Sequence, residues 1–468
     1  MSEDVSKTIQ HRATMSEKIA WGAGGMTENL VNAIYSLAFP IFSIGLGVSP
    51  ALMGIAQAVP RLVDAFTDPI MGNISDNTHT RWGRRRPFIF AGSLLLGLMV
   101  PLVFMPGQGW SELAYFAWFA VMTSLFFVMF TVWSVPWSAL GLELSDDYND
   151  RTRIQLTRMV FATIAGILVN WVYKLCFIFD SNEVLGARKA GWVVGGAMCL
   201  MGILSSLFVR EWRSTSKQAP IKLLAALKLT LTNKAFLLLC ATVLFFAGGL
   251  VMVAPMLLYV NIYYVFDGDR SAASTLVGVL GTIGALISTL MLPLGGRISS
   301  KLGKRKAAFI ALGMIIVGRA SQFFLIRPDM PYLQLICILI YLPGVMVMWA
   351  LIPSMIADVC DMDELESGRR REASFSSIYQ WIWKLGGTLA MTLGGLLLGL
   401  AGAKTEGDAE LSAEVVMNLR VLLSSVPTMM GVVALVCLWL YPLSEGRVAQ
   451  IKEELQLKKT EADPEKEM

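Results

Sequence analysis

Apolar stretches separated by short polar connections run through almost the whole chain. Because a helix needs about 20 apolar residues to cross the hydrocarbon core of a bilayer, each stretch of at least that length predicts one membrane-spanning helix. The predicted helices lie at 19–45, 50–75, 87–106, 114–143, 155–178, 190–209, 235–264, 272–296, 306–326, 333–357, 373–402 and 421–442. The pattern therefore predicts an all-α membrane protein with twelve transmembrane helices.

Several of these stretches are longer than a bilayer requires and contain proline. Proline removes a backbone donor and bends a helix, and a long apolar helix fits a bilayer by tilting. We therefore expect tilted helices with kinks at Pro40, Pro60, Pro136, Pro255 and Pro353.

The longest polar connection lies between the sixth and seventh predicted helices. Its stretch 221–231 combines apolar residues with Lys222 and Lys228, which is typical of an amphipathic helix on the membrane surface. The connection divides the chain into a cytoplasmic N-terminus (1–18), a first six-helix bundle (19–209), a cytoplasmic linker (210–234), a second six-helix bundle (235–442) and a charged cytoplasmic tail (443–468).

The two predicted bundles resemble each other. The matching segments are Pro69-Ile-Met-Gly-Asn-Ile-Ser75 before Arg81-Trp-Gly-Arg, against Pro293-Leu-Gly-Gly-Arg-Ile-Ser299 before Lys301-Leu-Gly-Lys, and Trp133 with Pro136, against Trp349 with Pro353. Two similar six-helix halves are the plan of the major facilitator transporters. We therefore expect a major facilitator fold built from two six-helix pseudo-repeats.

Composition excludes several classes of protein. Of 468 residues, 55% are hydrophobic and 16% are charged, against roughly a quarter charged in soluble proteins, which argues against a secreted or cytosolic enzyme. The net charge of +4 is too small to indicate a nucleic-acid partner. Six separate cysteines without zinc or redox spacing predict no cofactor. Residues 1–18 lack the pattern of a cleavable signal peptide, so the first helix is expected to direct insertion.

Lysine and arginine indicate the orientation in the membrane. They concentrate in the connections that lie on the same side as the N-terminus, and few occur in the others. Because cytoplasmic loops are rich in these residues, we expect both termini in the cytoplasm. The expected protein is a multi-pass monomer of the cell membrane, with the lipid bilayer as its surroundings.

The second predicted helix carries a stripe of polar residues. Gln57, Arg61, Asp64 and Asp68 follow 4-3-4 spacing, which places them on one face of a helix. One reading is an internal ion-pair ladder in which Arg61 neutralises Asp64. The other is a site for a coupling cation, Na⁺ or H⁺, because paired carboxylates bind hard cations and also raise one another's pKa. Thr67 and Thr131 would add neutral oxygens to that cation site.

A second set of polar and aromatic residues lies at similar depth in other helices. Ionisable groups at mid-depth are costly and are candidates for function. A lysine at the position of Lys384 needs an anion. One alternative is a pairing with Asp64 or Asp68 that depends on the bound cation, and the other is that the lysine side chain extends to the membrane interface. Flat aromatic faces beside hydrogen-bonding groups suit a sugar ring, although each is also compatible with helix packing. The candidate substrate residues besides Lys384 are Glu28, Asn29, Ser134, Trp349, Tyr379, Gln380 and Trp383, with Tyr35 and Trp133 at the same level.

The charged clusters at the inner helix ends determine topology, and we expect them to have a second role as gates. Ion pairs between basic clusters and inner carboxylates would close the cytoplasmic side and break when it opens. The gating candidates are Arg84, Arg85, Glu143, Asp358 and Asp361. His11 and His79 lie in polar segments, which argues against a histidine proton relay.

Three segments resemble one known family. Lys18-Ile-Ala-Trp-Gly-Ala-Gly24, Asp64-Ala-Phe-Thr-Asp-Pro-Ile-Met-Gly72 with Arg81-Trp-Gly-Arg84, and Ala357-Asp-Val-Cys-Asp-Met-Asp-Glu364 through Gly368-Arg-Arg-Arg-Glu372 look like the glycoside–pentoside–hexuronide:cation symporters of the melibiose permease type. The likeness covers about 18–445. The run that begins at Arg81 also looks like proton-coupled sucrose transporters, and some lysolipid symporters share the architecture.

The resemblance implies roles by position. Asp64 and Asp68 match the family's two cation-binding aspartates, and Thr67 and Thr131 match an asparagine ligand and an auxiliary threonine. Arg158, Trp349 and Lys384 match residues around the sugar and cation pathway. The sequence departs from the family where two sugar-binding carboxylates correspond to Asn29 and Ser134, and a lysine corresponds to Glu28. The resemblance therefore implies cation coupling but not a preference for galactosides.

The sequence thus predicts a secondary active transporter that couples Na⁺ or H⁺ to symport of a sugar, glycoside or sugar acid by alternating access. Two alternatives stay open. One is a lysolipid or amphiphile symporter of the same fold, and the other is a membrane sensor that binds without transporting.

Overall fold

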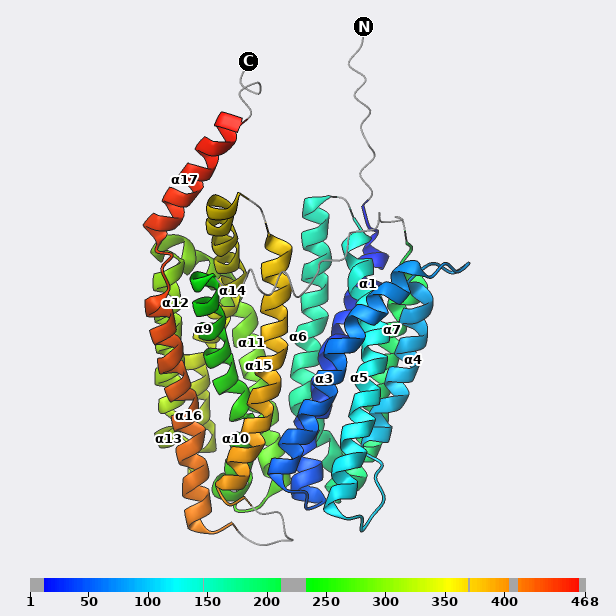
Figure 1. The fold of residues 1–468 in the computed structure, drawn as a ribbon. Helices are drawn as coiled ribbons and strands as arrows, with labels where there is room; N and C mark the ends of the chain where they lie inside the picture. The colour runs from blue at the N-terminus through cyan, green and yellow to red at the C-terminus, as the bar shows by residue number, and fades with distance from the viewer. Residues whose placement is uncertain (1–11, 146, 212–232, 369–370, 404–410, 463–468) are drawn as a thin grey trace. The chain divides into compact units, whose positions relative to one another are not determined.

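A computed structural model of the chain describes residues 12–145, 147–211, 233–368, 371–403 and 411–462, and no strand occurs among them. The chain divides into two compact units (Figure 1), an N-terminal unit (Met1–Lys217, with Thr405–Gly407) and a C-terminal unit (Gln218–Lys404 and Asp408–Met468). The surface helix predicted over 221–231 lies outside the described residues.

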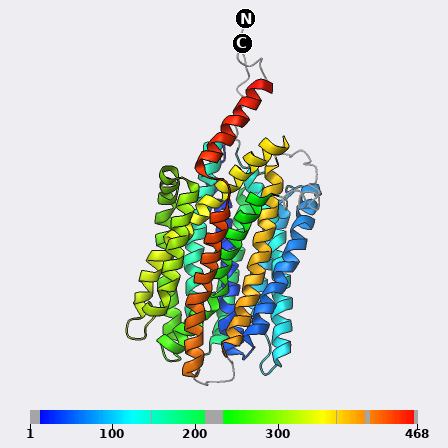
Figure 2. The same ribbon diagram turned by 60° about the vertical axis from the view of Figure 1, so that its left-hand side comes forward.

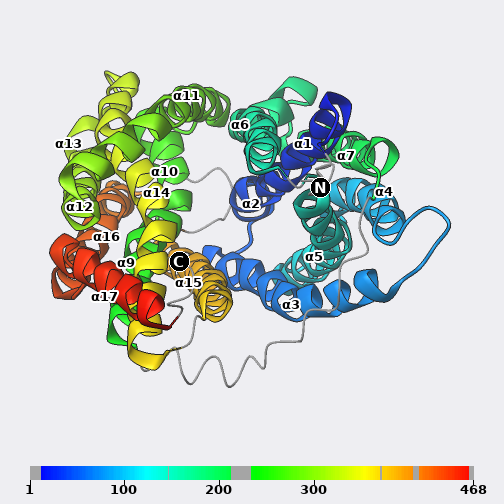
Figure 3. The ribbon, with the colours of Figure 1, turned by 90° about the horizontal axis from the view of Figure 1, so that it is seen from above.

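The N-terminal unit is a bundle of long helices. Its elements are α1 (Met15–Leu30), α2 (Asn32–Ala38), the π-helix η1 (Phe39–Gly45), α3 (Pro50–Asn77), α4 (Arg86–Val103), α5 (Glu112–Glu143), α6 (Tyr148–Phe179) and α7 (Glu183–Phe208). Neighbouring helices pack in the order α3, α5, α4, α7, α1, α6, which Figure 3 shows along the helix axes.

The C-terminal unit repeats this arrangement. Its elements are α9 (Lys234–Met252), α10 (Ala254–Val260), the π-helix η2 (Asn261–Val265), α11 (Arg270–Leu302), α12 (Lys304–Ala320), α13 (Gln322–Leu325), the 3₁₀-helix η3 (Pro331–Leu333), α14 (Gln334–Ser367), α15 (Glu372–Leu400), α16 (Ala413–Leu440) and α17 (Glu445–Ala462). The packing order is α11, α14, α12, α16, α9, α15. Each helix in this order occupies the place of its counterpart in the N-terminal unit, so the sequence repeat is also a structural repeat.

Ten helical segments among the described residues are long and apolar enough to cross a membrane. Two predicted spans, 19–45 and 50–75, are helical but do not belong to that set. The twelve-span count therefore stays a prediction. Charges on α3, which sequence reasoning assigned to function, are what reduce its apolar character.

The helices extend beyond the apolar runs that predicted them. The helix predicted at 155–178 begins at Tyr148, and the helix predicted at 333–357 ends at Ser367. Helix formation is cooperative, so backbone hydrogen bonding that begins in an apolar span propagates into the adjoining polar turns. The gating candidates Glu143, Asp358 and Asp361 consequently lie on helical ends and not in loops.

Proline affects the helices unequally. At Pro40 the first helix changes to a π-helix, and before Pro255 the seventh is interrupted at Val253. Pro60, Pro136 and Pro353 lie inside continuous helices. The π-helices η1 and η2 end equivalent segments of the two units, which is a further sign of the repeat.

The charged tail begins with a helix that packs against its own unit. Ile451 and Leu455 of α17 are buried in the core of the C-terminal unit, and Lys458 donates to the carbonyl oxygen of Leu365 on α14. Figure 2 shows the rest of α17 continuing past the end of α16.

Candidate cation and substrate site

Two carboxylates and two hydroxyls meet where α3 packs against α5. The hydroxyl oxygen of Thr131 lies 3.1 Å from Asp64 Oδ1 and 3.1 Å from Asp68 Oδ1. It also lies 3.2 Å from the hydroxyl oxygen of Thr67. All four residues of the predicted cation site, Asp64, Thr67, Asp68 and Thr131, therefore come together within the N-terminal unit.

The local structure explains this cluster. Asp64 and Asp68 are one helical turn apart on α3, so their side chains project from the same face. Thr131 lies at mid-length on α5, which crosses that face. Asp64 is 4% exposed and Thr131 is 1% exposed, so the cluster is shielded from bulk water on the α5 side.

The hydroxyl groups supply too few protons for the contacts. Thr131 has one proton and lies within hydrogen-bond distance of both carboxylates, while Thr67 also lies 3.4 Å from the carbonyl oxygen of Asp64. One hydroxyl proton cannot serve two carboxylate oxygens at full strength. The arrangement is compatible with a proton on one carboxyl group or with a cation beside both.

The donor set fits a hard monovalent cation or a proton. Carboxylate and hydroxyl oxygens are the ligands that such cations prefer. Among the described residues there is no group of three or more His, Cys, Asp or Glu arranged to hold a metal ion.

Arg61 contacts aromatic rings on the same stripe. Its guanidinium carbon lies 4.9 Å from the ring centroid of Tyr35 and 5.2 Å from that of Phe127. Two aromatic rings thus surround the guanidinium of Arg61, and the ion-pair ladder considered from the sequence stays a prediction. Gln57, one turn earlier, is buried and donates to the carbonyl oxygen of Met53 at 3.4 Å.

Glu28 and Arg158 form a bidentate ion pair between α1 and α6. Arg158 Nη2 lies 2.8 Å from Glu28 Oε1 and 2.7 Å from Oε2, and Arg158 Nε lies 3.0 Å from Oε2. The guanidinium also lies 5.5 Å from the ring centroid of Trp137. The sequence predicted both residues for the substrate site but did not predict that they pair.

The other candidates of the N-terminal unit are less closely connected. Asn29 donates from Nδ2 to the carbonyl oxygen of Gly25 at 3.0 Å, which leaves its side-chain oxygen as an acceptor. Ser134 is half-buried on α5, and Trp133 is fully buried in the core. Trp133 is therefore a packing residue.

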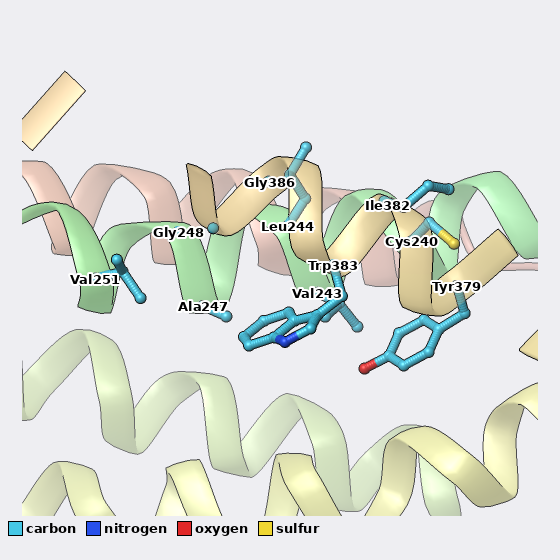
Figure 4. Close-up of a pocket in the computed structure, with 11 residues that line it drawn as sticks. Cys240, Val243, Leu244, Ala247, Gly248, Val251, Tyr379, Ile382, Trp383 and Gly386 are labelled. Carbon is cyan, nitrogen blue, oxygen red and sulfur yellow. The ribbon is translucent and has the colours of Figure 1, made fainter. Parts of the chain in front are cut away.

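The candidates of the C-terminal unit form an aromatic wall. Trp349 of α14 and Trp383 of α15 pack edge to face, with ring centroids 4.9 Å apart. Tyr379 and Trp383 line a pocket against α9, beside Val243 and Ala247 (Figure 4). The pocket volume is about 10 Å³, so it holds no more than one water molecule.

Two polar candidates accompany this wall on α15. Gln380 is exposed, and Lys384, one turn later, is half-buried. The carbonyl oxygen of Lys384 accepts a hydrogen bond from Thr388. On α15 the amide group of Gln380 and the ammonium group of Lys384 therefore accompany the ring of Trp383.

The gating candidates make ion pairs inside each unit. Arg84 and Arg85 reach Glu143 at 3.3 and 2.8 Å, and Arg85 also reaches Asp76 at 3.0 Å. In the C-terminal unit Lys304 reaches Asp358 at 2.6 Å. Asp361 follows Asp358 on α14 and is half-buried.

Sequence reasoning missed two glutamates that belong to these clusters. Glu211 follows α7 and accepts from the backbone N–H groups of Arg84, Arg85 and Arg86, at 2.8, 2.8 and 3.1 Å.

The glutamates Glu211 and Glu445 each lie against a glycine. A Cβ atom on Gly83 would lie 2.7 Å from Glu211 Oε1, and one on Gly303 would lie 2.3 Å from Glu445 Oε2. Both glycines also have positive φ angles, of 117° and 79°. A glutamate after the last spanning helix of each unit thus packs against the glycine before α4 or α12.

A buried tyrosine adjoins the cluster of the C-terminal unit. Tyr441, just after α16, lines a cavity of about 240 Å³ together with Lys304 and Asp358. Burial, with Asp358 nearby, raises the pKa of the Tyr441 phenol. Tyr441 therefore stays protonated at physiological pH.

Apolar spanning helices in two units of the same packing order, with carboxylates and hydroxyls buried among them, define a membrane transporter of the major facilitator type. Residues 20–445 match the family model described as MFS/sugar transport protein. The chain belongs to this family, whose members are transporters and not enzymes.

Three relatives match nearly their whole length. The uncharacterized symporter YnaJ of Bacillus subtilis is 27% identical over 97% of this chain and 96% of its own. The putative glycoside/cation symporter YagG of Escherichia coli is 27% identical over 94% of this chain and 95% of its own. The sodium-dependent lysophosphatidylcholine symporter 1 of Xenopus tropicalis is 24% identical over 97% of this chain and 92% of its own.

Solved structures share the fold. The crystal structure of a D-xylose-proton symporter superimposes with a TM-score of 0.63 at 14% identity, covering 91% of this chain and 97% of its own. Together with the family match, this confirms the all-α major facilitator fold expected from the sequence.

Proposed function

We propose that this protein is a symporter that couples the entry of Na⁺ or H⁺ to the transport of a carbohydrate by alternating access. The observation that carries the proposal is the approach of Thr131 to both Asp64 and Asp68. Carboxylate and hydroxyl oxygens that converge on one point supply the ligands for a cation or the acceptor for a proton. Because the binding of either changes the charge of a buried cluster, it shifts the balance between conformations and so drives transport.

A carbohydrate is the substrate class that the remaining groups support. The ion pair of Glu28 and Arg158 and the side-chain oxygen of Asn29 offer donors and acceptors to hydroxyl groups. The tryptophans of α14 and α15 offer flat faces to the C–H patches of a sugar ring. Membership of the sugar-transport family and the name of the relative YagG support the same class.

We place the transporter in the cell membrane as a monomer with both termini in the cytoplasm. The excess of lysine and arginine in the connections on the side of the N-terminus supports this orientation. The ion pairs around Glu143 and Asp358 would then lie at the cytoplasmic ends of the two units.

A lysolipid is the second candidate substrate. One relative is named as a sodium-dependent lysophosphatidylcholine symporter, and Asn29 and Ser134 replace carboxylates that bind sugar in the resembling family. The cation site serves either substrate, so only transport measurements decide between them.

Uptake into proteoliposomes tests the proposal. Purified protein is reconstituted, and labelled sugars, glycosides and lysophosphatidylcholine are supplied under an inward Na⁺ gradient, an inward proton gradient or neither. We expect one gradient to drive accumulation of a carbohydrate above its external concentration, and an ionophore to abolish it. Uptake that is indifferent to both gradients would refute cation coupling, and accumulation of the lysolipid alone would establish the second candidate.

A further inference from the structure

The guanidinium group of Arg158 already donates hydrogen bonds to other side chains of the protein. Its Nε and Nη2 atoms donate to the two oxygens of Glu28, and Nη1 donates to Gln155 Oε1 at 3.2 Å. The ring of Trp137 lies against the guanidinium. All three guanidinium nitrogens therefore have partners inside the N-terminal unit.

A carboxylate ligand would need the position that Glu28 holds. Arginine binds a carboxylate best through two parallel N–H donors, and in Arg158 these donors point to Glu28. A sugar acid must either displace Glu28, which leaves a half-buried carboxylate without its partner, or bind with two carboxylates beside one guanidinium. Both arrangements are unfavourable, because an unpaired or repelled charge in a partly desolvated site is costly.

An uncharged carbohydrate meets no such penalty. The side chains of Arg158 and Glu28 are 35% and 31% exposed, so the pair is accessible from one side. The carboxylate accepts from sugar hydroxyls, and the second N–H of Nη1 donates to them, while the pair keeps its zero net charge. The pair therefore recognises hydroxyl groups without demanding a charge on the ligand.

We propose that the ion pair of Glu28 and Arg158 determines specificity by admitting neutral sugars and glycosides and excluding sugar acids. This inference rests on the proposed carbohydrate transport and narrows its substrate to the uncharged class. Glu28, which contacts the substrate hydroxyls, is the residue that sets the selection.

Matched ligands test this selection directly. Nitrophenyl β-glucoside and nitrophenyl β-glucuronide share one ring and differ only at C6, where one carries a hydroxymethyl group and the other a carboxylate. The corresponding galactoside and galacturonide form a second pair. Binding to the purified protein is measured by titration calorimetry at pH 7 with saturating Na⁺ and no gradient, so the result does not depend on coupling.

We expect the wild-type protein to bind the neutral member of at least one pair at least tenfold more tightly than the acidic member. Glu28→Gln keeps the shape of the side chain and frees the guanidinium, so binding of the acidic member should strengthen at least tenfold. The control is Glu112→Gln. Glu112 lies at the start of α5, where its carboxylate accepts from the backbone N–H of Ser49. This substitution should leave the ratio of the two affinities unchanged.

Each outcome has one meaning. Preference of the wild-type protein for the acidic member overturns the selection, and this comparison needs no variant. A ratio that Glu28→Gln leaves unchanged, in a variant that elutes as a single species, overturns the role of Glu28. Absence of binding in both ligand pairs counts instead against the carbohydrate class of the proposed function.

Discussion

Trp21 and Trp137 each donate an indole N–H to the backbone carbonyl oxygen of the other, at 3.0 and 3.1 Å. Their rings are stacked with centroids 5.0 Å apart. A Cβ atom on Gly141 would lie 2.0 Å from the Trp21 ring, so glycine is what allows this close approach. The pair fixes α1, which carries Glu28, against α5, which carries Thr131.

Replacement of Trp137 should destabilise the N-terminal unit. Trp137→Phe removes one buried hydrogen bond and part of the stack, and we expect a loss of about 1–3 kcal/mol in the free energy of unfolding. Thermal unfolding in detergent measures it. Trp192→Phe is the control, because Trp192 is 53% exposed, and it should shift the melting temperature little. An equal shift in both variants would refute the structural role of the pair.

Removal of the Thr131 hydroxyl should weaken cation binding. Thr131→Val keeps the volume of the side chain but removes the oxygen between Asp64 and Asp68, and a hydrogen bond to a charged group contributes roughly 1.5–3 kcal/mol. We expect the affinity for the coupling cation to fall at least tenfold, measured by the cation dependence of uptake, and Thr131→Ser to retain most of it. Thr123→Val is the control, since Thr123 donates only to carbonyl oxygens of its own helix. Unchanged affinity in Thr131→Val would exclude Thr131 from the site.

The clustering of the four candidate cation ligands could be predicted from the sequence because it depends on one helical period and one resemblance. Asp64 and Asp68 are a turn apart on any helix, and the family motif supplied Thr131 from another helix. Glu211 carried no such signal, because its partners are backbone N–H groups of residues far away in sequence. Backbone donors at a helix start look the same in every sequence, so only the fold reveals what satisfies them.

The candidate substrate residues were chosen from the sequence one by one, and their contacts with one another were not predicted. Glu28 and Arg158 were both candidates, and their pairing depends on the packing of α1 against α6. Trp133 was grouped with polar residues by its depth, yet its orientation on α5 turns it into the core. Depth along a helix can be read from a sequence, whereas the direction of a side chain depends on which neighbour the helix packs against.

Asp68→Asn should abolish coupled accumulation while the protein still inserts and exchanges substrate. The amide keeps the shape of the side chain, but it removes the negative charge that attracts the cation. We expect concentrative uptake under a gradient to fall to the equilibrium level, and exchange of labelled for unlabelled substrate without a gradient to persist. Asp180→Asn, at a surface carboxylate beside Lys189, should transport like the wild type. Concentrative uptake by Asp68→Asn would remove Asp68 from the coupling site.

Glu211→Ala should loosen the start of α4. The carboxylate satisfies three backbone N–H groups at a helix N-terminus, where negative charge is favourable. Its loss should cost about 1–3 kcal/mol, because the orphaned donors lose a charged acceptor. Hydrogen exchange of the amides of Arg84 to Arg86 should accelerate, and the melting temperature should fall. Glu211→Gln keeps one acceptor oxygen and should show a smaller effect. If exchange at these amides is as slow in Glu211→Ala as in the wild type, the carboxylate does not cap α4 in the membrane.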